Sequence, residues 1–91
     1  MAEESSGVER FLRKDGRIDR YPRKQDARRL LLEWVAGKVL KHGERLDERS
    51  FNERLSEYSD DYVMLRRYLV DAQLVERTPD GSAYFLPRSG E

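Results

Sequence analysis

The sequence predicts a single α+β domain with a winged-helix-like fold. Apolar residues recur at helical spacing in three segments, and the last two are close enough to form a helix-turn-helix. Two turn-forming sequences, Asp15-Gly16 and Thr78-Pro-Asp-Gly81, indicate one hairpin before the helices and one after them. In this order of elements, the second hairpin, from Leu74 to Leu86, is the wing.

The length sets the size of this domain. The chain has 91 residues, of which 40% are charged, with 18 Lys and Arg against 18 Asp and Glu. One domain over residues 10–87 contains every predicted element, with residues 1–9 and 88–91 as disordered tails. Because a chain this short buries only about 60–65% of its unfolded surface, we expect a thin core.

The first hairpin and a long helix open the domain. Asp15-Gly16 suits a tight turn between the segments around Leu12 and Ile18, and Pro22 ends the extended chain. Lys41-His42-Gly43 is typical of a helix end, with Gly43 as a left-handed cap. Between them, apolar residues share one helical face: Ala27, Leu30, Leu31, Trp34, Val35 and Val39.

Two shorter helices follow. Leu46-Asp47 predicts a short strand and a helix N-cap, although Ser50 also fits a capping box, which leaves the start of this helix open. The segment Ser59-Asp60-Asp61 offers the cap of the third helix, which runs to about Ala72. We expect one core to bury residues from all three helices: Leu31, Trp34, Val35, Leu55, Leu65 and Leu69.

The composition argues against an enzyme. Without cysteine, and with His42 as the only histidine, the chain offers no thiol nucleophile and no multi-histidine metal site, so we expect no cofactor and no metal. The longest apolar run, Leu30 to Leu40, is far shorter than the ~20 residues that cross a bilayer. The first residues lack the order of a signal peptide. We therefore expect a non-enzymatic, cytoplasmic protein that does not contact a membrane.

Charge is distributed unevenly along the chain. Residues 10–29 contain nine basic and three acidic residues, whereas residues 44–61 contain three basic and seven acidic ones. A basic segment of this kind is a candidate for binding phosphate, and it is also consistent with attraction between two parts of the fold or with a solvated face. The candidates for positioning a nucleic acid are Arg13, Lys14, Arg17, Arg23, Arg28 and Arg29.

The third helix carries the candidates for reading bases, Arg66 and Arg67. Taking about 100° per residue, Arg67 lies about 200° from Leu65 and faces solvent. The structural alternative pairs Arg67 with Asp71 and lets Arg66 bridge a neighbouring acidic residue. The acidic start of this helix at Asp60 and Asp61, and an acidic wing tip, argue against insertion of its first turn into a groove.

Two further interpretations concern apolar residues. Tyr62, Val63 and Val70 are candidates for a surface that contacts a second copy or a regulator protein. The alternative function is therefore a protein-interaction or dimerisation module that does not contact DNA. Five aromatic residues are interpreted as core rather than as a small-ligand pocket: Trp34, Tyr58, Tyr68, Tyr84 and Phe85.

Several segments resemble one bacterial family. The stretch from Asp60 to Asp71, followed by Leu74-Val-Glu-Arg77 and Gly81-Ser-Ala-Tyr84, resembles the domain of unknown function 2087. Phe11-Leu12, Asp15-Gly-Arg-Ile18 and Tyr21-Pro-Arg-Lys24 match the opening of that family as well, so the resemblance covers roughly residues 10–86. In this family the domain stands alone or accompanies an ArsR-type helix-turn-helix regulator. The resemblance implies a bacterial, transcription-linked role.

Overall fold

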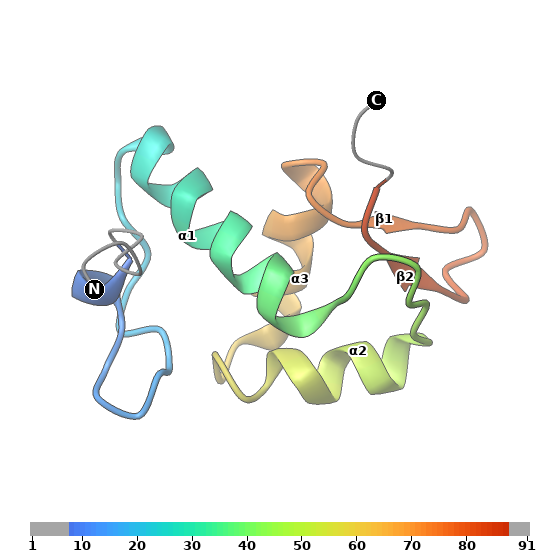
Figure 1. Cartoon of the computed structure of the whole chain (residues 1–91), viewed down its shortest axis with the longest axis horizontal. Coiled ribbons are helices and arrows are strands. Elements are labelled where there is room, and N and C mark those ends of the chain that lie inside the picture. The colour runs from blue at the N-terminus through green and yellow to red at the C-terminus, as the bar shows by residue number, and fades with distance from the viewer. Residues whose placement is uncertain (1–7, 88–91) are drawn as a thin grey trace.

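Three helices enclose the core, and a short antiparallel hairpin follows them (Figure 1). The computed structural model describes residues 8–87; residues 1–7 and 88–91, most of the two expected tails, lie outside the described residues. The predicted α+β class is confirmed. The elements are the 3-10 helix η2 (Glu9–Phe11), α1 (Gln25–Val39), α2 (Glu48–Leu55), α3 (Tyr62–Asp71), β1 (Glu76–Arg77) and β2 (Tyr84–Phe85).

Carboxylates cap α2 and α3 at their first turns. The Asp47 side chain accepts the Ser50 N–H at 2.8 Å, so α2 begins at Glu48 and not at the alternative cap. The Asp61 side chain accepts the Met64 N–H at 3.2 Å, as the sequence predicts for the third helix. Such caps satisfy N–H groups that have no partner inside the helix.

The first helix ends differently from the prediction. Leu40, which follows Val39, is already extended, so the helix stops before Lys41. Gly43 has φ 85° in a separate turn, which the Glu44 N–H closes by donating to the Lys41 carbonyl at 3.0 Å. The positive φ is as predicted, but Gly43 is not the helix cap.

The N-terminal hairpin is also reduced. Gly16 takes the predicted positive φ of 88°, and one antiparallel bridge joins Leu12 to Ile18. Two backbone hydrogen bonds flank the bridge, from the Arg13 N–H to the Arg17 carbonyl at 2.7 Å and from the Asp19 N–H to the Phe11 carbonyl at 2.8 Å. No further strand pairing extends it among residues 8–24, and the Ile18 N–H points outward and donates to the Tyr58 carbonyl at 2.8 Å. The segment is therefore held against the loop after α2 rather than paired along its length.

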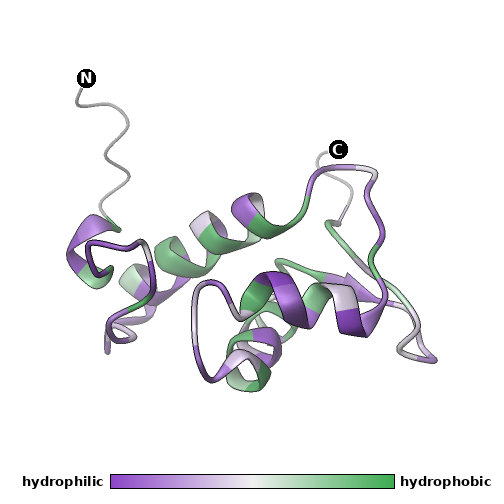
Figure 2. Ribbon diagram, turned by 90° about the horizontal axis from the view of Figure 1, so that it is seen from below, coloured by the Kyte–Doolittle hydropathy of each residue, from purple (hydrophilic) through white to green (hydrophobic). Residues whose placement is uncertain are grey.

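The core lies where the inward faces of the three helices meet (Figure 2). Five of the six predicted core residues are fully buried: Leu31, Val35, Leu55, Leu65 and Leu69. Trp34 is only half-buried, and its ring meets the edge of Tyr58 at 5.8 Å between centroids. Val8 is also fully buried, so the core begins two residues before the expected domain boundary.

The inward face of α1 is rotated from the predicted one. Leu30, expected inside, is 37% exposed, whereas Leu32 and Ala36 are buried. The pattern of apolar residues on α1 is broad enough to allow either face, since Leu30, Leu31 and Leu32 follow one another. Packing against α2 and α3 selects the side with Leu32.

The second hairpin forms as predicted, with shorter strands. Arg77 pairs with Tyr84 in the β1–β2 register, and Gly81 closes the turn with φ 75°. Tyr84 also forms an antiparallel bridge with Leu46, the predicted short strand, and its ring stacks on Phe51 of α2 at 4.8 Å. These contacts anchor the hairpin to α2, beside α3.

Candidate nucleic-acid interface

A basic hollow lies between η2 and the start of α1. It measures about 510 Å³, and its apolar lining comes from Phe11, Tyr21, Pro22 and Ala27. Its charged lining is entirely cationic: Arg10, Arg20, Arg23 and Lys24. Residues 10–24 fold back on themselves around Gly16, which brings Arg10 close to the later cations of this segment.

Two further hollows continue from the first one. The second, of about 380 Å³, lies between α1 and the C-terminal half of α3 and includes Arg28, Arg29 and Asp71. The third, of about 390 Å³, lies between α3 and the hairpin and also includes Asp71. The first and second hollows adjoin through the consecutive residues Lys24 and Gln25. The second and third hollows share Asp71, and the first lies next to the second along the chain, so we describe the three together as one surface.

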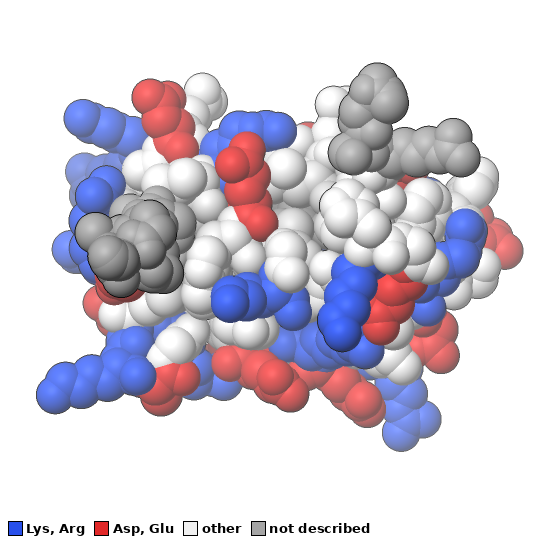
Figure 3. Space-filling view, viewed as in Figure 1, with Lys and Arg blue, Asp and Glu red and all other residues white. Residues whose placement is uncertain are grey.

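The lining of this surface is strongly cationic. Among the described residues that line these three hollows, Asp71 is the single carboxylate. A fourth hollow on the outer side of α1 shares Gln25 and Arg29 with the second one and adds the carboxylates of Asp26 and Glu33. Nine basic residues line the three hollows, and we call them the basic track: Arg10, Arg20, Arg23, Lys24, Arg28, Arg29, Arg66, Arg67 and Arg77. Figure 3 shows Lys and Arg gathered over the N-terminal segment and the start of α1, and it shows Asp and Glu over α1 as well as near α2.

The cations of the basic track differ in whether their side chains contact other residues of the domain. The side chains of five of them form no hydrogen bond, ion pair or ring contact within residues 8–87, and they are Arg20, Arg23, Lys24, Arg67 and Arg77. These side chains are exposed. All five can exchange water and counterions for a ligand while every interaction inside the domain stays in place.

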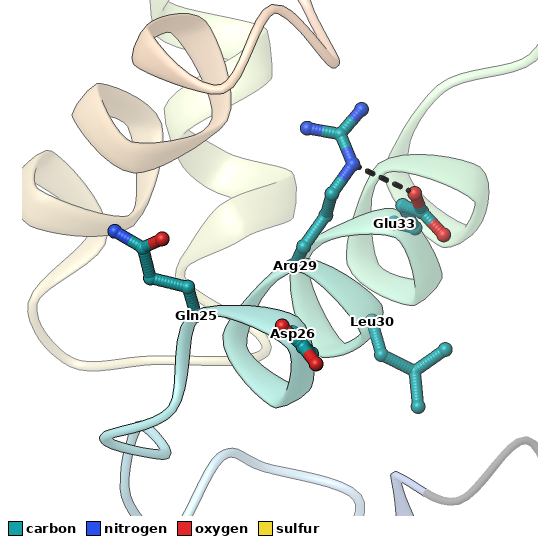
Figure 4. Close-up of a pocket in the computed structure, with 5 residues that line it drawn as sticks. All are labelled: Gln25, Asp26, Arg29, Leu30 and Glu33. Atoms are coloured by element: carbon teal, nitrogen blue, oxygen red, sulfur yellow. Dashed lines mark hydrogen bonds and ion pairs between the residues drawn. The ribbon is translucent and has the colours of Figure 1, made fainter.

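The two cations of the basic track on α1, Arg28 and Arg29, have partners within the domain. Arg28 lies over the Tyr68 ring at 5.3 Å and donates to the Pro22 carbonyl at 3.3 Å. Arg29 donates to Glu33 at 3.1 Å and to the Ala72 carbonyl at 3.2 Å. Figure 4 shows the Arg29–Glu33 pair along the outer side of α1. Both arginines fasten α1 to its surroundings and leave part of each guanidinium at the surface.

Of the two arginines on α3, Arg66 has a structural role and Arg67 remains a candidate for ligand binding. Arg66 donates to Asn52 at 2.7 Å and lies 3.5 Å from Glu48, so it bridges α3 to α2 as the structural alternative states. Arg67 faces solvent as predicted and forms no ion pair with Asp71. Only Arg67 of this pair is therefore free to contact a ligand with its whole guanidinium group.

Three sequence candidates lie outside the basic track. Arg17 donates to the Ser56 carbonyl at 2.8 Å and forms an ion pair with Asp60, so it holds the N-terminal segment against the loop between α2 and α3. Arg13 and Lys14 are exposed beside the Gly16 turn and line none of the three hollows.

Four members of the basic track were not among the residues predicted from the sequence. Arg10, Arg20 and Lys24 belong to the basic segment of residues 10–29, but the charge pattern gives no reason to select them from it. Arg77 had no local signal, because the return of the hairpin beside α3 places it in the third hollow.

The acidic groups that argued against a nucleic acid are bound within the domain. Arg17 neutralises Asp60, and Asp61 caps α3. At the hairpin turn, Asp80 accepts hydrogen bonds from the Thr78 hydroxyl and the Ser82 N–H. These bonds lower the pKa of Asp80 to about 2. These carboxylates stay exposed and charged, but each of them already accepts a hydrogen bond from the domain.

A comparison with protein families identifies the chain. The family model of an uncharacterized protein conserved in bacteria (DUF2087) matches residues 17–86. The chain belongs to the DUF2087 family. The DUF2087 region holds all three α-helices, the hairpin and every residue of the basic track except Arg10. No curated protein and no solved structure matches the chain.

Tyr21 connects the first hollow of this DUF2087 domain to α3. Its ring meets the edge of the Tyr68 ring at 5.1 Å, and its hydroxyl is buried without a hydrogen bond despite the nearby Ser59 side chain. Burial raises the pKa of Tyr21 to about 12, so the phenol is neutral at physiological pH. Tyr21 therefore serves as packing beneath the cations.

The candidates for a protein contact are not equally accessible. Val63 is 51% exposed, Val70 is half-buried in the third hollow, and Tyr62 packs against the core.

Of the helices that the structure describes, none has the length and apolar character to cross a membrane. Within residues 8–87, no three side chains of His, Asp or Glu come together in the manner of a metal site.

Proposed function

We propose that this domain binds nucleic acid through the basic track, as a cytoplasmic, non-enzymatic module associated with transcription in bacteria. The observation that carries the proposal is the set of three neighbouring hollows, with nine cations and one carboxylate among the described residues that line them. Cations aligned along a surface bind phosphates and release the counterions that surround a nucleic acid. The net charge of zero does not oppose this, because much of the negative charge lies near α2.

We further propose that the domain is a variant of the winged helix. The order of α2, a short loop, α3 and an anchored hairpin supports this assignment. In such folds the third helix and the wing contact the nucleic acid. Here the free cations of these two elements are Arg67 and Arg77, which share the third hollow, whereas Asp61 caps the first turn of α3. The proposed contact is therefore made by the C-terminal half of α3.

The alternative function is a protein-interaction or dimerisation module. The observation that favours it is the exposure of Val63 beside Val70 in the third hollow. Under this function the partner is a regulator protein or a second copy, and the affinity depends weakly on salt because an apolar contact releases few counterions.

Fluorescence anisotropy with labelled nucleic acid tests the proposal. We expect binding at low salt whose logarithm falls steeply with the logarithm of salt concentration. Replacing Arg23 and Lys24 together by Gln should weaken binding and reduce that slope by about 0.9 for each phosphate that the variant no longer neutralises. Neither side chain has a partner within the described residues, so the fold should be unaffected.

A matched control removes the same charge elsewhere. Lys41→Gln with Arg49→Gln changes two exposed residues outside the basic track, and it removes only a weak surface pair of 3.8 Å between Arg49 and Glu53. We expect this variant to bind as the natural protein does. Equal losses of affinity in both double variants, or no binding at low salt, would contradict the proposal. A dimer that dissociates on Val63→Ser in analytical ultracentrifugation would instead support the interaction module.

A further inference from the structure

Eight of the nine aromatic rings of this domain pack against another ring or a cation, and the ninth, Tyr62, is half-buried against the core. Three pairs of rings pack on each other, namely Tyr21 with Tyr68, Trp34 with Tyr58 and Phe51 with Tyr84. Cations cover further ring faces, with Arg10 4.7 Å from the centre of Phe11 and Arg45 4.4 Å from that of Phe85. Among the described residues the exposed large hydrophobic side chains are Leu30 and Val63, neither of them aromatic.

This arrangement bears on the form of the nucleic acid. Proteins that bind single strands stack the unpaired bases on open aromatic rings, which contribute about 1–3 kcal/mol per base, or roughly 5- to 150-fold in affinity. Two half-buried rings line the first hollow: Phe11 lies beneath the Arg10 guanidinium, and Tyr21 packs edge-on with Tyr68. A base could stack on the covered face of Phe11 only by displacing that cation.

Groups that read base edges are also few. Hydrogen bonds between α3 and α2 hold Arg66, and its side chain is only 21% exposed. Arg67 is the one fully free cation on α3 within the described residues, and its neighbours in the hollow are Val63 and Val70. The remaining free cations lie on the segment before α1 and on β1, where they are suited to phosphates.

We infer that the ligand of the basic track is a double helix, bound through its phosphates with little dependence on base sequence. This inference rests on the proposed function and adds the class of nucleic acid. In a duplex the bases are stacked inside, and the phosphates lie outside at about one charge per 1.7 Å of axis. A surface of free cations with covered rings matches that distribution of charge. A single strand would leave its bases without partners.

The test compares a duplex with each of its strands at the same salt concentration. A duplex of about 20 base pairs exceeds the 37 Å length of the domain, at ~3.4 Å per base pair. We expect the duplex to bind at least about tenfold more tightly than either strand, given the absence of stacking contributions. A second duplex of unrelated sequence should bind within about threefold of the first, because phosphate contacts carry no sequence information.

A variant of the covered ring adds an independent readout. Phe11→Leu keeps an apolar side chain and removes the ring, so duplex affinity should stay within about twofold, whereas stacking on this ring would show as a loss of at least about fivefold for single strands. Circular dichroism checks that this variant folds. Single strands that bind as tightly as the duplex, or that lose affinity in Phe11→Leu, would overturn the inference and leave the proposed function intact. If neither form binds at low salt, both are wrong.

Discussion

Replacing Arg17 tests whether this residue stabilises the fold or binds nucleic acid. The residue belongs to the basic segment, yet its guanidinium contacts Ser56 and Asp60 in the loop between α2 and α3. It holds the segment between η2 and α1 against the loop before α3. We expect Arg17→Ala to destabilise the domain and to leave the affinity for nucleic acid, measured per folded molecule, unchanged.

The size of the effect follows from the two contacts. The bond from Nη1 to the Ser56 carbonyl is 2.8 Å long and partly buried, and a hydrogen bond of a charged group contributes about 1.5–3 kcal/mol. The pair with Asp60 adds less than about 1 kcal/mol, because the Asp60 side chain is 93% exposed and water screens the attraction. We therefore expect Arg17→Ala to lower the free energy of unfolding by about 2–3 kcal/mol.

Denaturant unfolding followed by tryptophan fluorescence measures this destabilisation. Trp34 is the single tryptophan, and its ring lies against Tyr58, whose carbonyl accepts the Ile18 N–H next to Arg17. Arg13→Ala is the matched control, since that side chain is exposed and has no partner within the described residues, and it should change stability by less than about 0.5 kcal/mol.

A double-mutant cycle separates the two contacts of Arg17. Combining Arg17→Ala with Asp60→Asn should give a coupling free energy below about 1 kcal/mol, with the rest of the destabilisation assigned to the Ser56 carbonyl. A total effect under about 0.5 kcal/mol for Arg17→Ala would refute the structural role. An unchanged stability with weaker binding of nucleic acid would instead restore the assignment made from the sequence.

Three further predictions address the fold. Leu65 is fully buried, so Leu65→Ala should destabilise the domain by about 2–5 kcal/mol in denaturant unfolding, and a negligible effect would mean that α3 packs through another face. Gln73 ends α3 with φ 64°, a conformation that favours glycine, and Gln73→Gly should raise the free energy of unfolding by up to about 1 kcal/mol. The pKa of Asp80 is lowered to about 2 by its bonds to Thr78 and Ser82, so its contribution to stability is present above the ordinary pKa and disappears as the pH falls toward 2; a carboxyl NMR titration with a midpoint near 4 would contradict those bonds.

The sequence predicts local structure well where the decisive contact is local. Asp47 and Asp61 cap helices through N–H groups three residues ahead, and Gly16 and Gly81 form turns because glycine adopts positive φ at low cost. Each of these features depends on a few adjacent residues. The same holds for the helical spacing of Leu65 and Leu69, both of which are buried.

Contacts between distant segments account for the errors. Arg17 was assigned to a ligand because its partners lie 39 and 43 residues further along the chain. Leu30 was placed on the apolar face of the first helix because three consecutive leucines allow two faces, and only packing against the other helices selects Leu32. In both cases the sequence offers alternatives that have similar local energies.

The sequence by itself determined the α+β class, the three helices, the turns and the excess of positive charge before α1. The tertiary structure decided which of those charges are free, since hydrogen bonds from Arg17 and Arg66 to other elements turn two candidate contacts into structural links. It also brought Arg77 beside Arg67 across the third hollow. The physical reason is that local geometry follows from neighbouring residues, whereas a binding surface follows from which distant side chains remain without a partner after the chain has folded.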